Sequence, residues 1–189
     1  MSRLSDLALI TQVVTLGSER AFGQLVEAHQ EAVRRFLRRL TGGDEMLADD
    51  LAQETFIRAW QGLSSFRQLS GFETWLLRIA YRVFLDEKRK DSHSPLSHEG
   101  ESLDSLDSCA SATPLPSREG VGVGLSMDLD LALSTLSEVE RTCVVLQCVE
   151  GQSIRDIAGI TGIPENTVKS HLLRGKKNLA NYLRKNGYS

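Results

Sequence analysis

The sequence predicts an all-α fold of two small helical domains joined by a flexible linker. Apolar residues recur at helical spacing through most of the chain, and neither half contains a strand-like run of convincing length. A segment at 91–127 interrupts this pattern with Ser, Gly, Pro and Asp. A chain of 189 residues is long enough for two small domains. We therefore expect helical domains at 1–90 and 128–189.

The composition limits the classes of function. A net charge of -3 and a pI of about 5.8 argue against general coating of nucleic acid, so any basic surface has to be local. No apolar run approaches the ~20 residues that span a bilayer, and no signal-peptide pattern opens the chain. We expect a cytoplasmic protein without membrane insertion. Cys109, Cys143 and Cys148 lack metal-like spacing and are expected to be buried free thiols, with a redox sensor as the alternative.

Two helices are expected between residues 4 and 40, separated at Gly17-Ser18. The apolar face of the first consists of Leu4, Leu7, Ala8 and Val14. The second carries a broad apolar side made of Phe22, Leu25, Val26, His29, Val33, Phe36, Leu37 and Leu40. Its end is crowded by Arg34, Arg35, Arg38 and Arg39. Cations at this end interact favourably with the helix dipole, and binding of a partner is an equal alternative.

A third helix is expected at about 46–61, after the break at Thr41-Gly42-Gly43-Asp44. Its inward residues are Leu47, Leu51, Thr55 and either Ile57 or Phe56. Its polar face consists of Asp49, Asp50, Gln53, Glu54 and Arg58. Taken alone, this is an ordinary solvated face, without a pair of carboxylates in an evident pocket.

A loop at 62–71 and a helix at about 72–90 follow. The helix ends in the basic run Lys88-Arg89-Lys90. Aromatic side chains interleaved with arginines beside an exposed loop suit stacking on unpaired bases combined with phosphate contacts. The alternative is that Phe72, Trp75 and Phe84 belong to the core. For Trp75 both can hold, because an indole can be half packed and half presented.

The segment at 91–127 is acidic and shows no sustained periodicity. It cannot bury enough apolar area to offset its ordering entropy, so we expect a flexible linker.

The second domain is expected to contain a helix-turn-helix. Ser137 with Glu140 is a capping-box pattern, in which the carboxylate reaches back to the start of the helix. The apolar stripe behind it consists of Val139, Cys143, Leu146 and Val149. A short helix from Ser153 and a longer one at about 165–185 are separated by the break Gly162-Ile163-Pro164. Two helices joined by a tight Gly-containing turn, the second one basic, are typical of DNA-binding domains.

The last helix indicates which face binds DNA. Val168, Leu172, Leu179 and Leu183 form its packing side. Much of the remaining surface is polar or basic, and cations there suit phosphates and the edges of bases in the major groove. A solvated amphipathic helix is the alternative, but the capped helix and turn that precede it favour DNA binding.

The motifs of the first domain resemble region 2 of bacterial sigma factors. They are Asp49-Asp50-Leu-Ala-Gln53-Glu54-Thr-Phe56-Ile-Arg-Ala-Trp60, Phe66-Arg67 and Phe72-Glu-Thr74-Trp75-Leu76-Leu-Arg78-Ile79-Ala80, followed by Asp86. The segment from Leu136 to Leu183 resembles their region 4. A linker in place of region 3 makes the resemblance one to the extracytoplasmic-function (ECF) group.

This resemblance implies an alternative sigma factor that binds core RNA polymerase, directs it to promoters and helps melt the -10 element. The residues implied in core polymerase binding are Asp50, Gln53, Glu54 and Arg58. Those implied at the -10 element, where one base is flipped into a pocket of the loop, are Phe66, Arg67, Ser70, Trp75, Arg78, Arg82, Lys88 and Arg89. Those implied at the -35 duplex are Lys169, Ser170, His171, Leu173, Arg174, Lys176 and Lys177. An anti-sigma factor is a further implied partner.

Two other classes of function stay open. One is a conventional helix-turn-helix regulator, which binds duplex DNA alone and tightly. The other is a sigma-like decoy, which binds polymerase or an anti-sigma factor without starting transcription. An enzyme is the least supported class, because no phosphate-binding Gly-rich loop, metal-ligand cluster or nucleophile–base pair is visible. No cofactor and no metal are expected.

Overall fold

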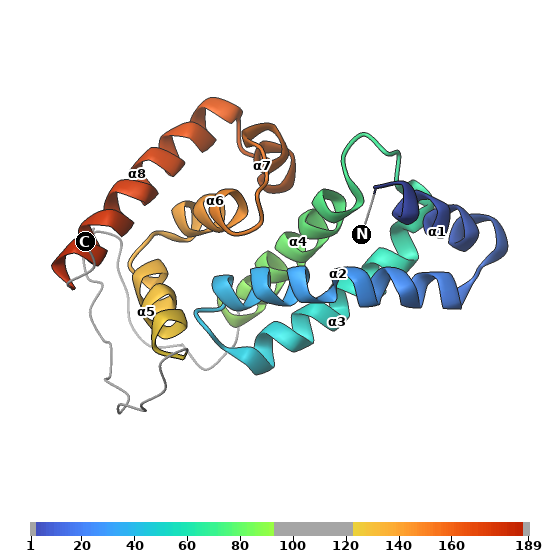
Figure 1. The fold of residues 1–189 in the computed structure, drawn as a ribbon, viewed down its shortest axis with the longest axis horizontal. Coiled ribbons are helices and arrows are strands. Elements are labelled where there is room, and N and C mark those ends of the chain that lie inside the picture. Colours follow the sequence, from blue (N-terminus) through green and yellow to red (C-terminus); the bar gives the residue numbers. More distant parts are fainter. Residues whose placement is uncertain (1–2, 93–122, 187–189) are drawn as a thin grey trace.

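The computed structural model describes residues 3–92 and 123–186, and every regular element in these ranges is helical. The predicted all-α fold class is confirmed. The elements are α1 (Arg3–Leu16), α2 (Glu19–Leu40), α3 (Glu45–Gly62), a 3₁₀ turn η1 (Leu63–Ser65), α4 (Phe72–Ser92), α5 (Val123–Ser134), α6 (Glu138–Cys148), α7 (Ile154–Thr161) and α8 (Glu165–Lys185). Figure 1 shows α1–α4 as one bundle and α5–α8 as a second group beside it. In the described ranges, no helix has the length and apolar character needed to cross a membrane.

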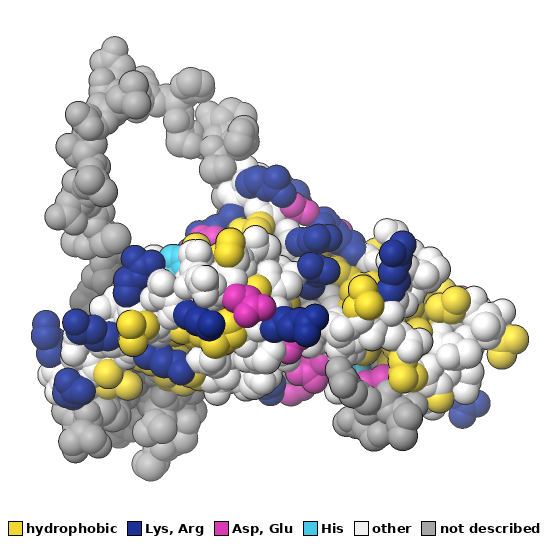
Figure 2. Space-filling model, turned by 90° about the horizontal axis from the view of Figure 1, so that it is seen from above, with side chains coloured by type: hydrophobic (Ala, Val, Ile, Leu, Met, Phe, Trp, Pro, Cys, Tyr) yellow, Lys and Arg dark blue, Asp and Glu magenta, His cyan; other side chains and the backbone are white. Residues whose placement is uncertain are grey.

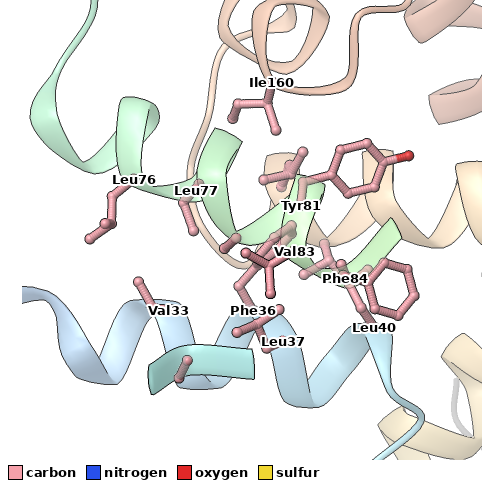
Figure 3. Close-up of a cluster of buried hydrophobic side chains, with 14 of the residues drawn as sticks. Val33, Phe36, Leu37, Leu40, Leu76, Leu77, Tyr81, Val83, Phe84 and Ile160 are labelled. Carbon is pink, nitrogen blue, oxygen red and sulfur yellow. The ribbon is translucent and has the colours of Figure 1, made fainter. Parts of the chain in front are cut away.

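Helix α2 is the central element of the N-terminal bundle, because it packs against α1, α3 and α4. Ser18 caps its first turn by accepting a hydrogen bond from the Ala21 amide. The predicted apolar side is largely confirmed, with Leu25, His29, Val33, Phe36, Leu37 and Leu40 buried. Figure 3 shows this side of α2 facing the buried side chains of α4.

The predicted inner face of α1 is partly wrong. Ala8 and Val14 are exposed, whereas Ile10 and Val13 are buried together with Asp6. Asp6 Oδ1 lies 3.3 Å from Nε2 of the buried His29, so the helix turns its carboxylate inward with its apolar residues. The prediction of this inner face used apolar residues at helical spacing, so it could not identify a face that includes a carboxylate.

The inner face of α3 follows one of the two predicted alternatives. Leu51 and Thr55 are buried as expected, and Phe56 is half-buried and packs against the core, whereas Ile57 is 53% exposed. The other buried positions are the small residues Ala48, Ala52 and Ala59. Small side chains let α3 approach its neighbours closely, which leaves the larger Ile57 on the outside.

Helix α5 was not predicted, and it corrects the boundary of the expected linker. Residues 123–127, assigned to the linker, are helical, as are the first two linker residues, 91 and 92. The remainder of the predicted linker, 93–122, lies outside the described residues. In α5, Ala132 and Leu133 are buried, and Leu133 belongs to the core. The helix therefore contributes packing to the C-terminal group.

The two helical groups pack directly on one another. Helix α4 lies against α7, and α2 lies against α6. The buried side chain of Ile160 on α7 approaches Leu77 and Tyr81 of α4, as Figure 3 shows. The core is consequently continuous across both groups.

Polar contacts reinforce this packing. Arg35 donates two hydrogen bonds to the carboxylate of Glu150, from Nε at 3.0 Å and from Nη2 at 2.6 Å. Thr74 donates one to Gln152 at 2.8 Å, and Arg39 pairs with Asp130. The side chain of Glu150 has no exposed surface. Two of the four clustered arginines therefore hold the C-terminal helices.

The other two arginines of the cluster, Arg34 and Arg38, pair with carboxylates of α3. Arg34 Nε lies 2.9 Å from Asp49, and Arg38 Nη1 lies 3.6 Å from Glu45. Each arginine of the cluster thus has a partner within the chain.

The cysteine prediction holds for Cys143 and is wrong for Cys148. Both are free and lie on α6, but Cys148 is exposed. Burial raises the pKa of the Cys143 thiol to about 11, so this thiol stays protonated and inert near neutral pH. Cys109 lies outside the described residues.

Arg35→Ala is expected to lower the free energy of unfolding by about 2–3 kcal/mol, because it leaves the Glu150 carboxylate buried without its partner. Urea denaturation followed by tryptophan fluorescence measures this. Arg34→Ala is the matched control, since Arg34 and Asp49 are each about half exposed, and its loss should stay below about 1 kcal/mol. Equal losses of unfolding free energy in the two variants would contradict the conclusion that Glu150 depends on Arg35 as its buried partner.

Candidate nucleic-acid and polymerase interfaces

Helices α6, α7 and α8 form the helix-turn-helix predicted from the sequence. Ser137 caps α6, and Ser153 caps α7, each by accepting a hydrogen bond from an amide three residues later. Gly162 ends α7 with a φ of 76°, a conformation that favours glycine. Val168 and Leu172 are buried, which fixes the orientation of α8 about its own axis.

The carboxylate of Glu140, expected to reach back to the cap of α6, lies instead 3.7 Å from Arg174 Nε of α8. Gly175 sits next to this contact at the crossing of α6 and α8. An added Cβ there would lie 2.8 Å from Cγ2 of Val144. The close approach of the two helices therefore depends on glycine.

The outward face of α8 presents the residues predicted at the -35 duplex. Those that are exposed are Lys169, Ser170, Leu173, Arg174, Lys176 and Lys177, while His171 is half-buried. Leu173 is 74% exposed, and an apolar side chain among cations suits a thymine methyl group in the major groove. Figure 2 shows Lys and Arg side chains gathered at the end of the molecule that α8 forms.

A hollow of about 500 Å³ opens beside the loop 64–71, between α3 and α4. Six of the eight residues predicted at the -10 element line it, namely Phe66, Arg67, Ser70, Trp75, Arg78 and Arg82. Arg58 lines it as well, so four guanidinium groups surround one depression. We call it the arginine hollow. Its charge suits phosphate groups.

Phe66, Phe72 and Trp75 form an aromatic cluster at the wall of this hollow. The ring centroids of Phe66 and Trp75 are 5.4 Å apart, and those of Phe72 and Trp75 are 5.7 Å apart. Phe72 and Phe84 are buried, so the core interpretation holds for them. Trp75 is half-buried and lines the hollow, so one face packs while another is available for stacking.

Lys88 and Arg89, also predicted at the -10 element, do not line the arginine hollow. Lys88 Nζ lies 3.0 Å from Glu138 at the start of α6, and Arg89 pairs with Asp86. The structure therefore does not bring these two residues together with the other six.

The residues predicted to bind polymerase divide into two groups on α3. Asp50 and Gln53 are exposed. Glu54 and Arg58 pair at 2.7 Å, and Arg58 also donates to Asp86 at 2.6 Å. The hydrogen bond to Asp86 raises the pKa of Arg58 and lowers that of the Asp86 carboxyl. Arg58 thereby connects the polar face of α3 with the arginine hollow.

An apolar patch next to this polar face was missed by the sequence reasoning. An open depression of about 350 Å³ is lined by Phe22, Phe56, Ile57 and Trp60. The rings of Phe22 and Trp60 meet edge to face, with centroids 4.9 Å apart. The sequence signal was present, because Ile57 and Trp60 are three residues apart on α3 and share a face.

Helix α7 lies close to Trp75 and Arg78, which are predicted at the -10 element. A small cavity of about 160 Å³ separates the loop and the first turns of α4 from α7, and both Trp75 and Arg78 line it. Within the described residues, no group of three or more His, Cys, Asp or Glu is placed to hold a metal ion.

The family models that match this chain are Sigma-70 region 2, over residues 25–94, and Sigma-70 region 4, over residues 126–179. The ECF RNA polymerase sigma factor SigW of Bacillus subtilis is 31% identical over 90% of this chain and 93% of its own length. The chain belongs to the ECF RNA polymerase sigma factors. It is an alternative sigma factor, and its function lies in transcription initiation.

Further relatives support this membership. SigM of Mycobacterium tuberculosis is 32% identical over 95% of this sigma factor and 85% of its own length. The chain spans 41% of the probable RNA polymerase sigma factor RfaY of Xanthomonas campestris, at 30% identity. Among solved structures, CnrH in complex with the cytosolic domain of CnrY is 26% identical, with a TM-score of 0.70 over 96% of this chain and 98% of that one.

The sigma factor RpoE of Bartonella quintana, in complex with the anti-sigma factor NepR, is also 26% identical. Its TM-score is 0.66 over 86% of this chain and 96% of that one. A superposition that covers so much of the chain includes both helical groups.

Gly175→Ala is expected to destabilise this sigma factor by about 1–3 kcal/mol, because the new methyl group forces α6 and α8 apart. Gly23→Ala is the matched control, since a Cβ at this helical position meets nothing within 4 Å. It should stabilise by up to about 1 kcal/mol. Thermal unfolding of both variants measures the difference, and equal effects would show that α8 does not need the close crossing.

Proposed function

We propose that this sigma factor binds core RNA polymerase through α3, reads and melts the -10 element with the arginine hollow, and reads the -35 duplex with α8. The observation that carries the proposal is the presence of two distinct basic surfaces on one chain of net charge -3. One surface combines four guanidinium groups with an aromatic wall, which suits unpaired bases. The other is an exposed basic helix, which suits a duplex groove.

The polymerase-docking role is assigned to Asp50, Gln53 and Glu54, with Arg58 as the link to the hollow. The apolar patch beside them extends this surface with hot-spot residue types such as tryptophan. Because partner docking buries apolar area, the exposure of Trp60 and Ile57 supports a protein partner on this side. A sigma factor acts on chromosomal promoters, so the proposed location is cytoplasmic, and no catalytic activity of its own is proposed.

Run-off transcription with purified core polymerase and promoter fragments from the source genome tests the docking proposal. Asp50→Ala and Gln53→Ala are expected to lower specific transcripts about tenfold or more, because truncated hot-spot contacts cost on the order of 2 kcal/mol. Glu27→Ala, which removes an exposed carboxylate from α2, is the matched control and should transcribe normally. Normal transcription by the Asp50 and Gln53 variants would place the docking surface elsewhere.

The same assay separates the two other candidate functions. A conventional regulator would bind duplex DNA tightly without polymerase and produce no transcripts. A decoy would bind polymerase and produce neither transcripts nor DNA contacts.

An anti-sigma factor is proposed as a further partner. CnrH was solved with the cytosolic domain of CnrY and RpoE with NepR, and both superpose on this chain over its two helical groups. Shared placement of the groups supports a partner of the same class.

Arg82→Ala is expected to weaken binding of the holoenzyme to single-stranded -10 DNA in a salt-dependent way. Removing one phosphate contact should reduce the slope of log affinity against log salt concentration by about 0.7. Fluorescence anisotropy over a series of salt concentrations measures the slope. Arg20→Ala is the control, because Arg20 is exposed on α2 and does not line the hollow. An unchanged slope in the Arg82 variant would remove this residue from the DNA path.

A further inference from the structure

Helix α6 carries a buried carboxylate that faces α8. Glu140 is 9% exposed, and its Oε1 lies 3.7 Å from Nε of Arg174 on α8. An ionised carboxylate in such a position is stabilised by a nearby cation. Arg174 is the cation that the structure places there, and 61% of its own side chain is exposed. One end of this ion pair is therefore fixed in the interior, and the other lies on the surface predicted to meet the -35 duplex.

The packing of α6 on α8 holds Glu140 in this position. A Cβ added at Gly175 would lie 3.4 Å from Cβ and 3.5 Å from the carbonyl oxygen of Glu140. The backbone of α8 therefore runs directly against Glu140, at the residue that follows Arg174. Side chains in such close packing are held in defined rotamers. The carboxylate consequently has a defined place relative to the backbone of Arg174.

Arg174 is contacted from a second side by His171. Nη2 of Arg174 lies 3.3 Å from Nδ1 of His171, one turn earlier on α8. An arginine nitrogen can only donate, so Nδ1 accepts this hydrogen bond when the ring proton is on Nε2. Glu140 and His171 together restrain a long side chain at two of its three nitrogens.

The lysines of the same face differ from Arg174. Lys169, Lys176 and Lys177 are exposed, and no ion pair within the part of the chain that the structure describes includes any of them. A lysine is a flexible point charge that suits phosphates of any sequence, whereas the planar guanidinium of arginine forms two parallel hydrogen bonds in a fixed geometry. The cation that is restrained before DNA binds is thus the one whose chemistry can distinguish bases.

We propose that Glu140 is a positioning residue for DNA recognition, which orients Arg174 so that its guanidinium reads one guanine of the -35 duplex rather than the neighbouring phosphates. The inference rests on the proposed reading of the -35 duplex by α8. With Nε directed to Glu140, the end of the guanidinium remains for O6 and N7 of a guanine, the acceptors that arginine contacts most often in the major groove. A restrained arginine also loses less conformational entropy on binding, which favours the contact that fits its orientation.

The carboxylate of Glu140 has a second effect on binding, through its charge. A negative group 3.7 Å from the guanidinium offsets part of its attraction for phosphates, which is independent of sequence. Removal of this charge should therefore lower discrimination between sequences without lowering the affinity for DNA in general. A residue that only stabilised the fold would behave differently, because its removal would weaken binding to every sequence.

The test uses holoenzyme assembled from core polymerase and the full chain, with promoter DNA in which each base pair of the -35 element is replaced in turn. Competition binding measures the affinity for each promoter. Arg174→Ala identifies the base pair that Arg174 reads, because discrimination should be lost at that position alone. There, wild-type holoenzyme is expected to discriminate about tenfold or more, and Glu140→Gln about threefold or less. Glu140→Gln should bind the substituted promoter at least as tightly as the wild type does.

Three further variants separate positioning from folding. Glu138→Gln removes a carboxylate from the same helix, but this carboxylate pairs with Lys88 at 3.0 Å, so discrimination should be unchanged. Glu140→Leu fills a similar volume without charge and should lose discrimination as Glu140→Gln does. Combining Glu140→Gln with Arg174→Ala should give the same discrimination as Arg174→Ala alone, because Glu140 acts through Arg174. Thermal unfolding of each variant verifies that it is folded at the assay temperature.

The outcomes distinguish this inference from the function on which it rests. Wild-type discrimination in folded Glu140→Gln holoenzyme, an equal loss at every -35 position, or unchanged discrimination in Arg174→Ala holoenzyme overturns the inference alone. Wild-type holoenzyme that does not discriminate between -35 sequences at all overturns the proposed reading of the duplex as well. A loss in Glu140→Gln at the position that Arg174 reads, which is absent from Glu138→Gln, supports Glu140 as the positioning residue.

Discussion

One buried charge fixes how the helix-turn-helix meets the N-terminal bundle, in addition to the apolar core that the two groups share. The side chain of Glu150 has no exposed surface, and an ionised carboxylate in that position requires a close partner. Arg35 supplies it through two hydrogen bonds, and the same contact raises the pKa of the arginine. Because Arg35 belongs to α2 and Glu150 follows α6, this pair fixes the helix-turn-helix against the N-terminal bundle.

That placement has opposite effects on the two proposed DNA surfaces. The outward face of α8 remains exposed, since α8 is anchored through Val168, Leu172 and Gly175 on its inner side. The -10 surface is more confined, because α7 packs on α4 and shares a cavity with Trp75 and Arg78. The arginine hollow is therefore bounded by α7 on the side of Trp75 and Arg78. CnrH, solved with the cytosolic domain of CnrY, has the same overall placement of helices.

The sequence predicted what depends on local pattern. The ends of α8, the hydroxyl cap at Ser137 and the break at Gly162 follow from spacing, capping and turn chemistry, and the structure agrees at each. The resemblance to sigma factors supplied the residues that the arginine hollow brings together. The predictions that failed concern which side chains are buried, and this depends on how the helices pack against one another. Ile57 and Phe56 were left as alternatives for one inner position, and only packing decides that Phe56 contacts the core while Ile57 stays exposed. Val14 was expected inside, but the helix turned toward a histidine partner for Asp6.

The same limit explains why the sequence could not predict the cavity of about 160 Å³ that lies between α1 and the loop 64–71. Asp6 and Phe66 are 60 positions apart in the chain, and only the packing of α1 beside the loop brings them to one cavity. The carboxylate in this cavity and the guanidinium groups in the arginine hollow give the two sides of the loop opposite charge, which the net charge of the chain does not reveal. Phosphates are drawn to the guanidinium groups and repelled from the carboxylate, although the two cavities share a loop. A phosphate backbone on this side of the molecule is therefore favoured at the arginine hollow and disfavoured beside Asp6.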